Sequence, residues 1–246
     1  MAEFPHDNIR PFSETGSKKE QVGEMFDQIA PRYDFMNRFL SLGIDVKWRK
    51  KAIKSLQEVN PKIILDVATG TGDMAIMASR IIKPEKIVGI DISANMLEYG
   101  RQKIEKQGLN QVIELQQGDG ETINFPDNSF DGVMVAFGVR NFENLELGLM
   151  EIRRVLKPGA RLIILEFTRP HLPVIKGIYK FYMNVVAPRI GRMISKNNNA
   201  YQYLNDSVQQ FPERKTFLNI LEKLGYKNTS YKTLTLGICS IYCAEK

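Results

Sequence analysis

Two glycines followed by an acid about 20 residues later form the most chemically suggestive pattern in the sequence. Gly70 and Gly72 follow an apolar run that ends at Val67, and a ligand can approach a glycine backbone closely. Asp91 ends the next apolar run, where its carboxylate can accept hydrogen bonds from both ribose hydroxyls, each contributing about 1.5 to 3 kcal/mol. The pattern predicts a nucleoside site. It also satisfies the dinucleotide fingerprint, so an NAD enzyme fits equally well at this point, and a tight turn without a ligand is the remaining interpretation.

The elements around this turn alternate between strands and helices. Short apolar runs predict strands at 63–67, 87–92, 112–115, 130–137 and 161–167, separated by predicted helices at 73–82, 94–107 and 145–156. A helix at 213–224 and strands at 226–233 and 238–244 follow, and the short link between these two strands suits an antiparallel pair. The expected fold is therefore α/β, a doubly wound and mostly parallel seven-stranded sheet with an antiparallel C-terminal strand.

Helices are expected before and within this framework. Ser17 and Glu20 have capping-box spacing at the start of a predicted helix over 17–30, and a second helix over 45–56 carries a basic face. An aromatic and apolar stretch at 173–193 predicts a helical insertion, closed by a turn at 197–199. We expect one domain over 1–246, composed of an N-terminal helical cap (1–60), a cofactor-binding core (61–167), a substrate-pocket insertion (168–212) and a C-terminal helix and strand pair (213–246).

Composition narrows the class of protein only in part. No apolar run reaches the roughly 18 residues that a membrane span needs, and residues 1–10 lack a signal-peptide core, so we expect a cytoplasmic protein. Cys239 and Cys243 are expected to be reduced, and no metal site is expected because the only histidines, His6 and His171, lie far from them. The net charge of +6 suits nucleic acid, anionic lipid or an acidic ligand without choosing among them.

Three further blocks distinguish between the nucleoside enzymes. Asp119 closes the third predicted strand, where it could hold an adenine amino group, and the blocks at 126–131 and 155–162 open the fourth and fifth strands. In this order the series resembles the class I S-adenosylmethionine-dependent methyltransferases over about residues 62–167. Asp66, at the end of the first strand, would then lie near the cationic methionine portion of the cofactor, whereas an NAD enzyme needs no charge there.

The resemblance becomes more specific outside the core. From about Val22 onward the chain is similar to the ubiquinone/menaquinone biosynthesis C-methyltransferases, in the blocks Tyr33-Asp34-x-Met36-Asn37, Leu42-Gly43-Ile44 with Trp48, Phe137-Gly138-Val139-Arg140-Asn141, Leu165-Glu166-Phe167, Pro188-Arg189-Ile190-Gly191, Tyr201-x-Tyr203-Leu204-x-x-Ser207 and Phe211-Pro212. This resemblance implies cofactor contacts at Asp66, Gly70, Thr71, Gly72, Asp91, Ile92, Asp119, Gly120 and Ala136. Many family members have Ser at the position of Ala136. Here only the backbone can contact the cofactor, and the lost side-chain hydrogen bond costs about 1 kcal/mol of binding free energy.

The resemblance also implies a reaction. The sulfonium methyl would pass to a ring carbon of a prenylated hydroquinone, most directly demethylmenaquinol in menaquinone biosynthesis, and the ring carbon becomes nucleophilic as the phenol loses its proton. Arg140 is the predicted cation beside the developing phenolate, with Asn141 orienting either Arg140 or the quinol oxygen. Asp34 is the predicted proton acceptor, unless water serves, and Tyr33 is expected to hydrogen-bond the ring oxygen.

Alternatives stay open at this stage. They are methylation of the benzoquinol precursor of ubiquinone, methylation of RNA, protein or another small molecule, an NAD oxidoreductase, and a non-catalytic protein that keeps the fold. No nucleic-acid module is visible, so no nucleic-acid partner is expected. The basic face formed by Lys47, Lys50, Lys51 and Lys54 would suit peripheral contact with the inner face of the cell membrane, although a solvated helix face explains it as well. Homodimerisation is left open.

Overall fold

The computed structural model describes residues 4–12, 15–171, 173, 175, 177 and 198–246. In this part of the chain seven strands form one sheet in the order β3-β2-β1-β4-β5-β7-β6. Five strands are parallel: β1 (Ile63–Val67), β2 (Lys86–Asp91), β3 (Ile113–Gln117), β4 (Phe130–Ala136) and β5 (Leu156–Phe167). The hairpin of β6 (Lys227–Leu234) and β7 (Cys239–Glu245) adds two antiparallel strands. The predicted fold class is confirmed.

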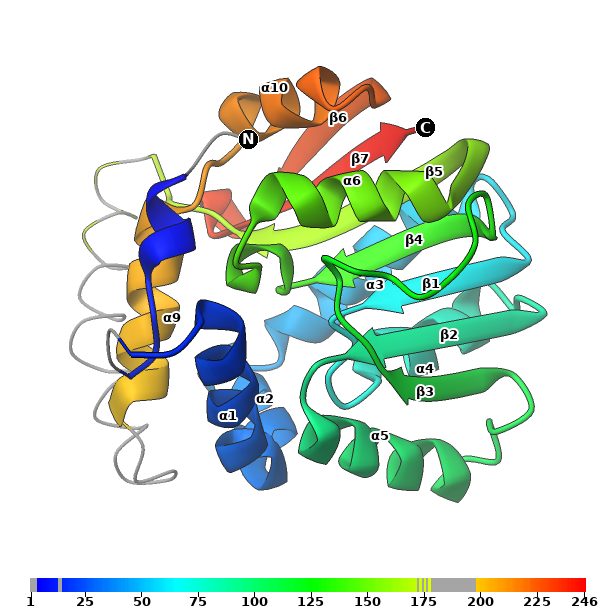
Figure 1. Cartoon of the computed structure of the whole chain (residues 1–246), viewed down its shortest axis with the longest axis horizontal. Coiled ribbons are helices and arrows are strands. Elements are labelled where there is room, and N and C mark those ends of the chain that lie inside the picture. Colours follow the sequence, from blue (N-terminus) through cyan, green and yellow to red (C-terminus); the bar gives the residue numbers. More distant parts are fainter. Residues whose placement is uncertain (1–3, 13–14, 172, 174, 176, 178–197) are drawn as a thin grey trace.

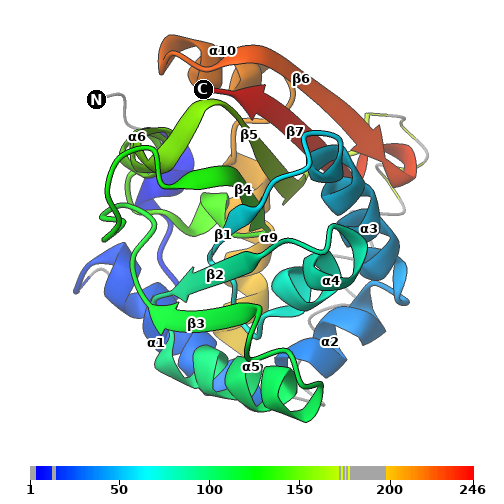
Figure 2. The same cartoon turned by 90° about the vertical axis from the view of Figure 1, so that its right-hand side faces the viewer.

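Helices cover both faces of the sheet (Figure 2). One face packs against α3 (Ile44–Gln57), α4 (Asp73–Ile81) and α5 (Ala94–Lys106), and the other against α6 (Leu145–Val155) and α10 (Lys215–Lys223). Two apolar clusters form the core around the sheet, one on each face. Both include side chains of β1, β2 and β4, because these strands are buried on both sides. Continuous apolar runs are typical of such strands.

The N-terminal helices lie at the carboxyl end of the parallel strands (Figure 1). Helix α1 (Lys18–Ile29) begins at Ser17, whose hydroxyl accepts a hydrogen bond from Glu20 N while the Glu20 carboxylate accepts one from Ser17 N, so the predicted capping box is confirmed. A 3₁₀ turn, η2 (Ala30–Arg32), leads into α2 (Tyr33–Leu40). Among the described residues, no helix is long and apolar enough to cross a membrane.

Helix α9 (Asn198–Gln210) begins where the sequence predicts a turn. The sequence predicts a turn at 197–199, but Asn198 and Asn199 begin α9, so that prediction is wrong for them. Asparagine accepts a hydrogen bond from free N–H groups at a helix start as readily as in a turn, so the residue type does not distinguish the two. Asn197, the Pro188–Gly191 block and most of the predicted insertion at 173–193 lie outside the described residues.

Candidate active site

The glycine turn between β1 and α4 has the backbone that its sequence requires. Gly70 and Gly72 have φ angles of 57° and 75°, in the left-handed region that favours glycine. The Asp91 carboxylate, at the end of β2, accepts hydrogen bonds from Gly70 N at 2.7 Å and from Ser93 N at 2.9 Å. Asp91 therefore ties the turn to the start of α5. Carboxylate oxygens have further lone pairs, so they can still accept ribose hydroxyls.

Asp66 is a buried carboxylate that lacks a full set of partners. It is 1% exposed, and its Oδ2 accepts a hydrogen bond from Thr69 Oγ1 at 2.6 Å. Oδ1 has no hydrogen-bond partner in the part of the chain that the structure describes. Burial raises the pKa of Asp66 to about 7. A buried anion of this kind is matched by a cationic ligand, so the site fits the ammonium and sulfonium groups of S-adenosylmethionine.

Asp119 and Gly120 follow β3, at the same carboxyl end of the parallel strands as the glycine turn and Asp91. Lys19 Nζ of α1 lies 2.5 Å from Asp119 Oδ2, and a Cβ on Gly120 would come within 2.9 Å of the Phe142 ring. Ile92 packs beside Gly23 of α1. Helix α1 therefore covers the positions assigned to the adenosine end of the cofactor, and Asp119 must share its carboxylate with Lys19. Thr71 donates a hydrogen bond to Asp34, and Ala136 is the last residue of β4.

The two buried acids predict a pH dependence of cofactor binding. Burial raises the pKa of Asp66 to about 7 and that of Asp91 to about 6. The ammonium and ribose hydroxyls of the ligand favour the ionised carboxylates, so affinity should fall as pH decreases through 7, by up to about tenfold per unit. Calorimetric titration of S-adenosylhomocysteine from pH 8.5 to 5.5 measures this. An affinity that is flat across the range would contradict it, and Asp66→Asn should remove the component near pH 7.

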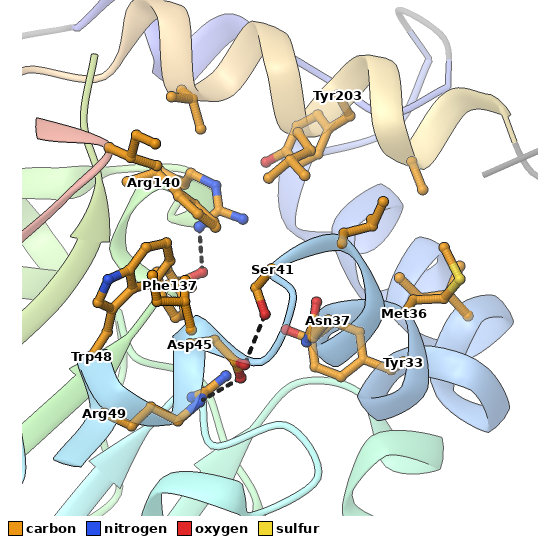
Figure 3. A pocket seen from close by; sticks show the side chains of 18 of the residues that line it. Tyr33, Met36, Asn37, Ser41, Asp45, Trp48, Arg49, Phe137, Arg140 and Tyr203 are labelled. Carbon is orange, nitrogen blue, oxygen red and sulfur yellow. Dashed lines mark hydrogen bonds and ion pairs between the residues drawn. The ribbon is translucent and has the colours of Figure 1, made fainter. Parts of the chain in front are cut away.

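A cavity of about 340 Å³ adjoins this edge of the sheet. Its wall is mainly apolar and aromatic and comes from α1, α2, α3, α9 and the ends of β4 and β5 (Figure 3): Met25, Phe26, Ile29, Met36, Leu40, Leu42, Ile44, Trp48, Phe137, Phe167, Ala200, Leu204, Val208 and Ile238. The polar groups that enter it come from Arg32, Tyr33, Asn37, Ser41, Asp45, Arg49, Arg140, Tyr203 and Thr235. A large apolar chamber with a few fixed polar groups suits a hydrophobic ring substrate.

Arg140 lies in the 3₁₀ turn η3 (Val139–Asn141) and is 5% exposed. Its Nη1 donates hydrogen bonds to Phe137 O at 2.6 Å and to Glu166 Oε1 at 2.8 Å. Glu166 is fully buried in β5; burial raises its pKa, and the Arg140 charge opposes that shift. The pair holds a fixed guanidinium in the cavity wall, where a developing phenolate could be stabilised.

Lys18 supports the loop that carries Arg140. This lysine is fully buried, and its ammonium donates hydrogen bonds to the carbonyl oxygens of His6 (2.8 Å), Arg140 (3.1 Å) and Phe142 (2.8 Å). Burial lowers the pKa of Lys18 to about 8. The start of α1 and the η3 turn are thus fixed to one another through a single side chain.

The other predicted catalytic residues occupy different places. Tyr33 lines the cavity, and its ring lies 3.9 Å from where a Cβ on Gly70 would stand, so it separates the cavity from the glycine turn. Asn141 donates from Nδ2 to Phe137 O and accepts at Oδ1 from Tyr203 OH at 3.1 Å. Asp34 is not among the residues that line the cavity; its carboxylate accepts from Thr71 Oγ1 and Lys103 Nζ, both at 2.6 Å. The structure therefore brings Arg140 and Tyr33 together and sets Asp34 apart, on the cofactor side.

Several site residues were not singled out from the sequence. In the sequence, Glu166 stands within a motif without a role of its own, and Asp45 and Arg49 are only part of the predicted helix over 45–56. The available signal was a charge in a buried position: Glu166 interrupts the apolar run of β5, and Asp45 and Arg49 share the helical face of α3 that buries Trp48 and Ile53. Ionised side chains are almost never fully buried without a partner, so such positions mark sites.

Comparison with known proteins gives consistent results. The model of the ubiE/COQ5 methyltransferase family matches residues 14–246. Demethylmenaquinone methyltransferase of Bacteroides fragilis is 45% identical over 99% of both chains. The ubiquinone/menaquinone biosynthesis C-methyltransferase UbiE of Geotalea daltonii is 47% identical over 93% of this chain and 97% of its own. Among solved structures, a SAM-dependent methyltransferase of Aquifex aeolicus superposes with a TM-score of 0.53 at 22% identity, covering 74% of this chain and 81% of its own. At that identity the likeness concerns the fold alone.

Proposed function

The chain belongs to the ubiE/COQ5 methyltransferase family and is an S-adenosylmethionine-dependent C-methyltransferase of quinone biosynthesis, and we propose that its substrate is a demethylmenaquinol. The observation that carries this proposal is the apolar cavity in which Arg140 is held beside the cofactor edge of the sheet. A relative that aligns over nearly the whole chain is named for this naphthoquinol reaction, which favours it over the benzoquinol.

The residues of the chain have distinct tasks in this reaction. S-adenosylmethionine supplies an electrophilic methyl group. The aromatic wall with Trp48, Phe137 and Phe167 encloses the quinol ring and excludes water, which strengthens electrostatic interactions in the cavity. Arg140 stabilises negative charge on the ring oxygen as the neighbouring carbon attacks, and Glu166 holds Arg140 in place. Asp34 already forms an ion pair with Lys103, so we assign proton removal to water.

The test uses labelled methyl groups and a choice of acceptors. The purified protein is incubated with tritiated S-adenosylmethionine and, in separate reactions, reduced demethylmenaquinone, a reduced demethylated benzoquinone and bulk RNA. We expect label in the naphthoquinol. Label in the benzoquinol alone would overturn the substrate, label in RNA alone would overturn quinol methylation, and no transfer to any acceptor would contradict the proposal.

We also propose that α9 forms part of a pocket for the isoprenoid tail. Ala200, Leu204 and Val208 of α9 face the cavity, as expected if residues 168–212 form a substrate-pocket insertion. Leu42, at the turn between α2 and α3, lines the same cavity and is 91% exposed. An apolar side chain in such a position suits a substrate that enters from a bilayer rather than from water.

Peripheral membrane contact leads to a prediction for α3. Its four lysines, Lys47, Lys50, Lys51 and Lys54, are all exposed and follow Leu42 in the chain. Each basic residue near an anionic surface contributes about 1 kcal/mol. Changing all four to Gln should therefore strongly reduce sedimentation with phosphatidylglycerol vesicles. A variant with four other exposed lysines changed, Lys83, Lys106, Lys215 and Lys223, controls for net charge. Equal binding by the two variants would exclude α3 as the docking face.

A further inference from the structure

Helix α3 carries a buried cation whose bonding is incomplete. Arg49 is 6% exposed, and its Nε lies 3.6 Å from Asp45 Oδ2, beyond hydrogen-bond distance. Nε has no hydrogen-bond partner in the described part of the chain. Asp45 is itself occupied, because its carboxylate accepts hydrogen bonds from Arg38 Nη1 and Ser41 Oγ. A buried guanidinium in this state is costly unless an anion completes its bonding.

Arg49 lines the cavity and also lies within electrostatic range of Asp66, at the end of the strand that leads into the cofactor turn. Its guanidinium carbon lies 5.3 Å from the centre of the Phe137 ring, and Figure 3 shows Arg49 and Arg140 on opposite sides of that ring. The Arg49 charge lowers the pKa of Asp66, against the larger effect of burial, so the two side chains are near enough to interact electrostatically. No direct ion pair joins them. Tyr33, which also feels the Arg49 charge, packs against Gly70.

Arg49 and Asp66 thus form a matched pair of incompletely bonded, buried groups of opposite charge. Asp66 Oδ1 lacks a partner as Arg49 Nε does, within the part of the chain that the structure describes. A ligand that carries an anionic group and a cationic group on the same carbon could complete both, whereas a quinol oxygen supplies only an anion. An α-amino acid group has this arrangement.

We propose that Arg49 binds the carboxylate of the amino-acid end of S-adenosylmethionine while Asp66 binds its ammonium. The inference rests on the proposed function, since it concerns the methyl donor of that reaction. Arginine suits the role because its planar fork of donors matches a carboxylate. Since Arg49 also forms part of the cavity wall, this anchor fixes the sulfonium at the boundary of the substrate chamber.

The test compares two ligands that differ in the amino-acid group. S-adenosylhomocysteine carries it, and 5′-methylthioadenosine keeps the adenosine and the thioether without it. By calorimetry, Arg49→Gln should weaken binding of S-adenosylhomocysteine about 10- to 100-fold and leave binding of methylthioadenosine unchanged. Arg49→Lys should recover part of the loss because it restores the charge. Arg80→Gln, a matched change at an exposed position near the end of α4, should change neither affinity.

The outcomes separate this inference from the proposed function. Unchanged methylthioadenosine binding shows that the Arg49→Gln variant keeps its nucleoside site. An equal loss for both ligands, or unchanged binding of S-adenosylhomocysteine with a raised KM for the quinol, would overturn the role of Arg49 and leave the proposed function standing. Failure of the unaltered protein to bind S-adenosylhomocysteine would instead contradict the proposed function itself.

Discussion

Replacing Arg140 with Met should lower kcat by about 10²- to 10³-fold while the affinity for S-adenosylhomocysteine stays within about twofold. The size of this decrease in kcat is that expected for the loss of one fixed group that stabilises developing oxyanion charge. The cofactor residues Asp66 and Asp91 lie on β1 and β2 and do not hydrogen-bond Arg140, so binding of the methyl donor should not depend on Arg140. Single-turnover kinetics with saturating methyl donor, together with calorimetry, measure the two quantities.

The single substitution leaves Glu166 buried without its partner, which costs about 3 to 5 kcal/mol of stability when a buried pair is broken. The double variant Arg140→Met/Glu166→Gln removes both charges and is the matched control for folding. It should recover most of the melting temperature and none of the kcat. A double variant with near-normal turnover would show that Arg140 serves only to satisfy Glu166.

Replacing Asp91 with Ala should instead act on cofactor binding. The affinity for S-adenosylhomocysteine should fall by about 10²-fold or more. Two hydrogen bonds from ribose hydroxyls to a charged acceptor are lost, each contributing about 1.5 to 3 kcal/mol. Gly70 N and Ser93 N also lose the acceptor that holds the turn. Asp91→Asn keeps an acceptor and should lose less. Asp127→Asn, at an exposed position, is the control and should bind normally; Asp91→Ala binding as tightly as this control would remove Asp91 from the site.

The glycine turn and its acids were predictable because their signal is local. A buried parallel strand, the turn after it and the next helix are encoded within about 30 consecutive residues, and apolar runs fix where each strand ends. Gly70, Gly72 and Asp91 therefore fall where the pattern places them. The antiparallel β6–β7 hairpin was predictable for the same reason, since its short link leaves few alternatives.

The cavity was less predictable because distant segments build it. Arg140, in the turn after β4, meets Glu166 of β5, and Tyr203 reaches Asn141 from a helix 62 residues further along the chain. Residue type alone indicates neither pairing. Asp34 is an example of a residue whose position the sequence does not predict. Its motif suggests a place over the substrate, but α2 directs its carboxylate toward Lys103 and Thr71. Which face of a short helix is buried depends on its packing partners, and these lie far away in sequence.

The most direct test of carbon methylation beside Arg140 is the position of the transferred methyl group. The purified protein is incubated with S-adenosylmethionine labelled with ¹³C in the methyl group and reduced demethylmenaquinone, and the product is examined by NMR. We predict that the label is bonded to the ring carbon next to the prenyl-bearing carbon. A label on a ring oxygen, as a methyl ether, would contradict carbon methylation in this cavity.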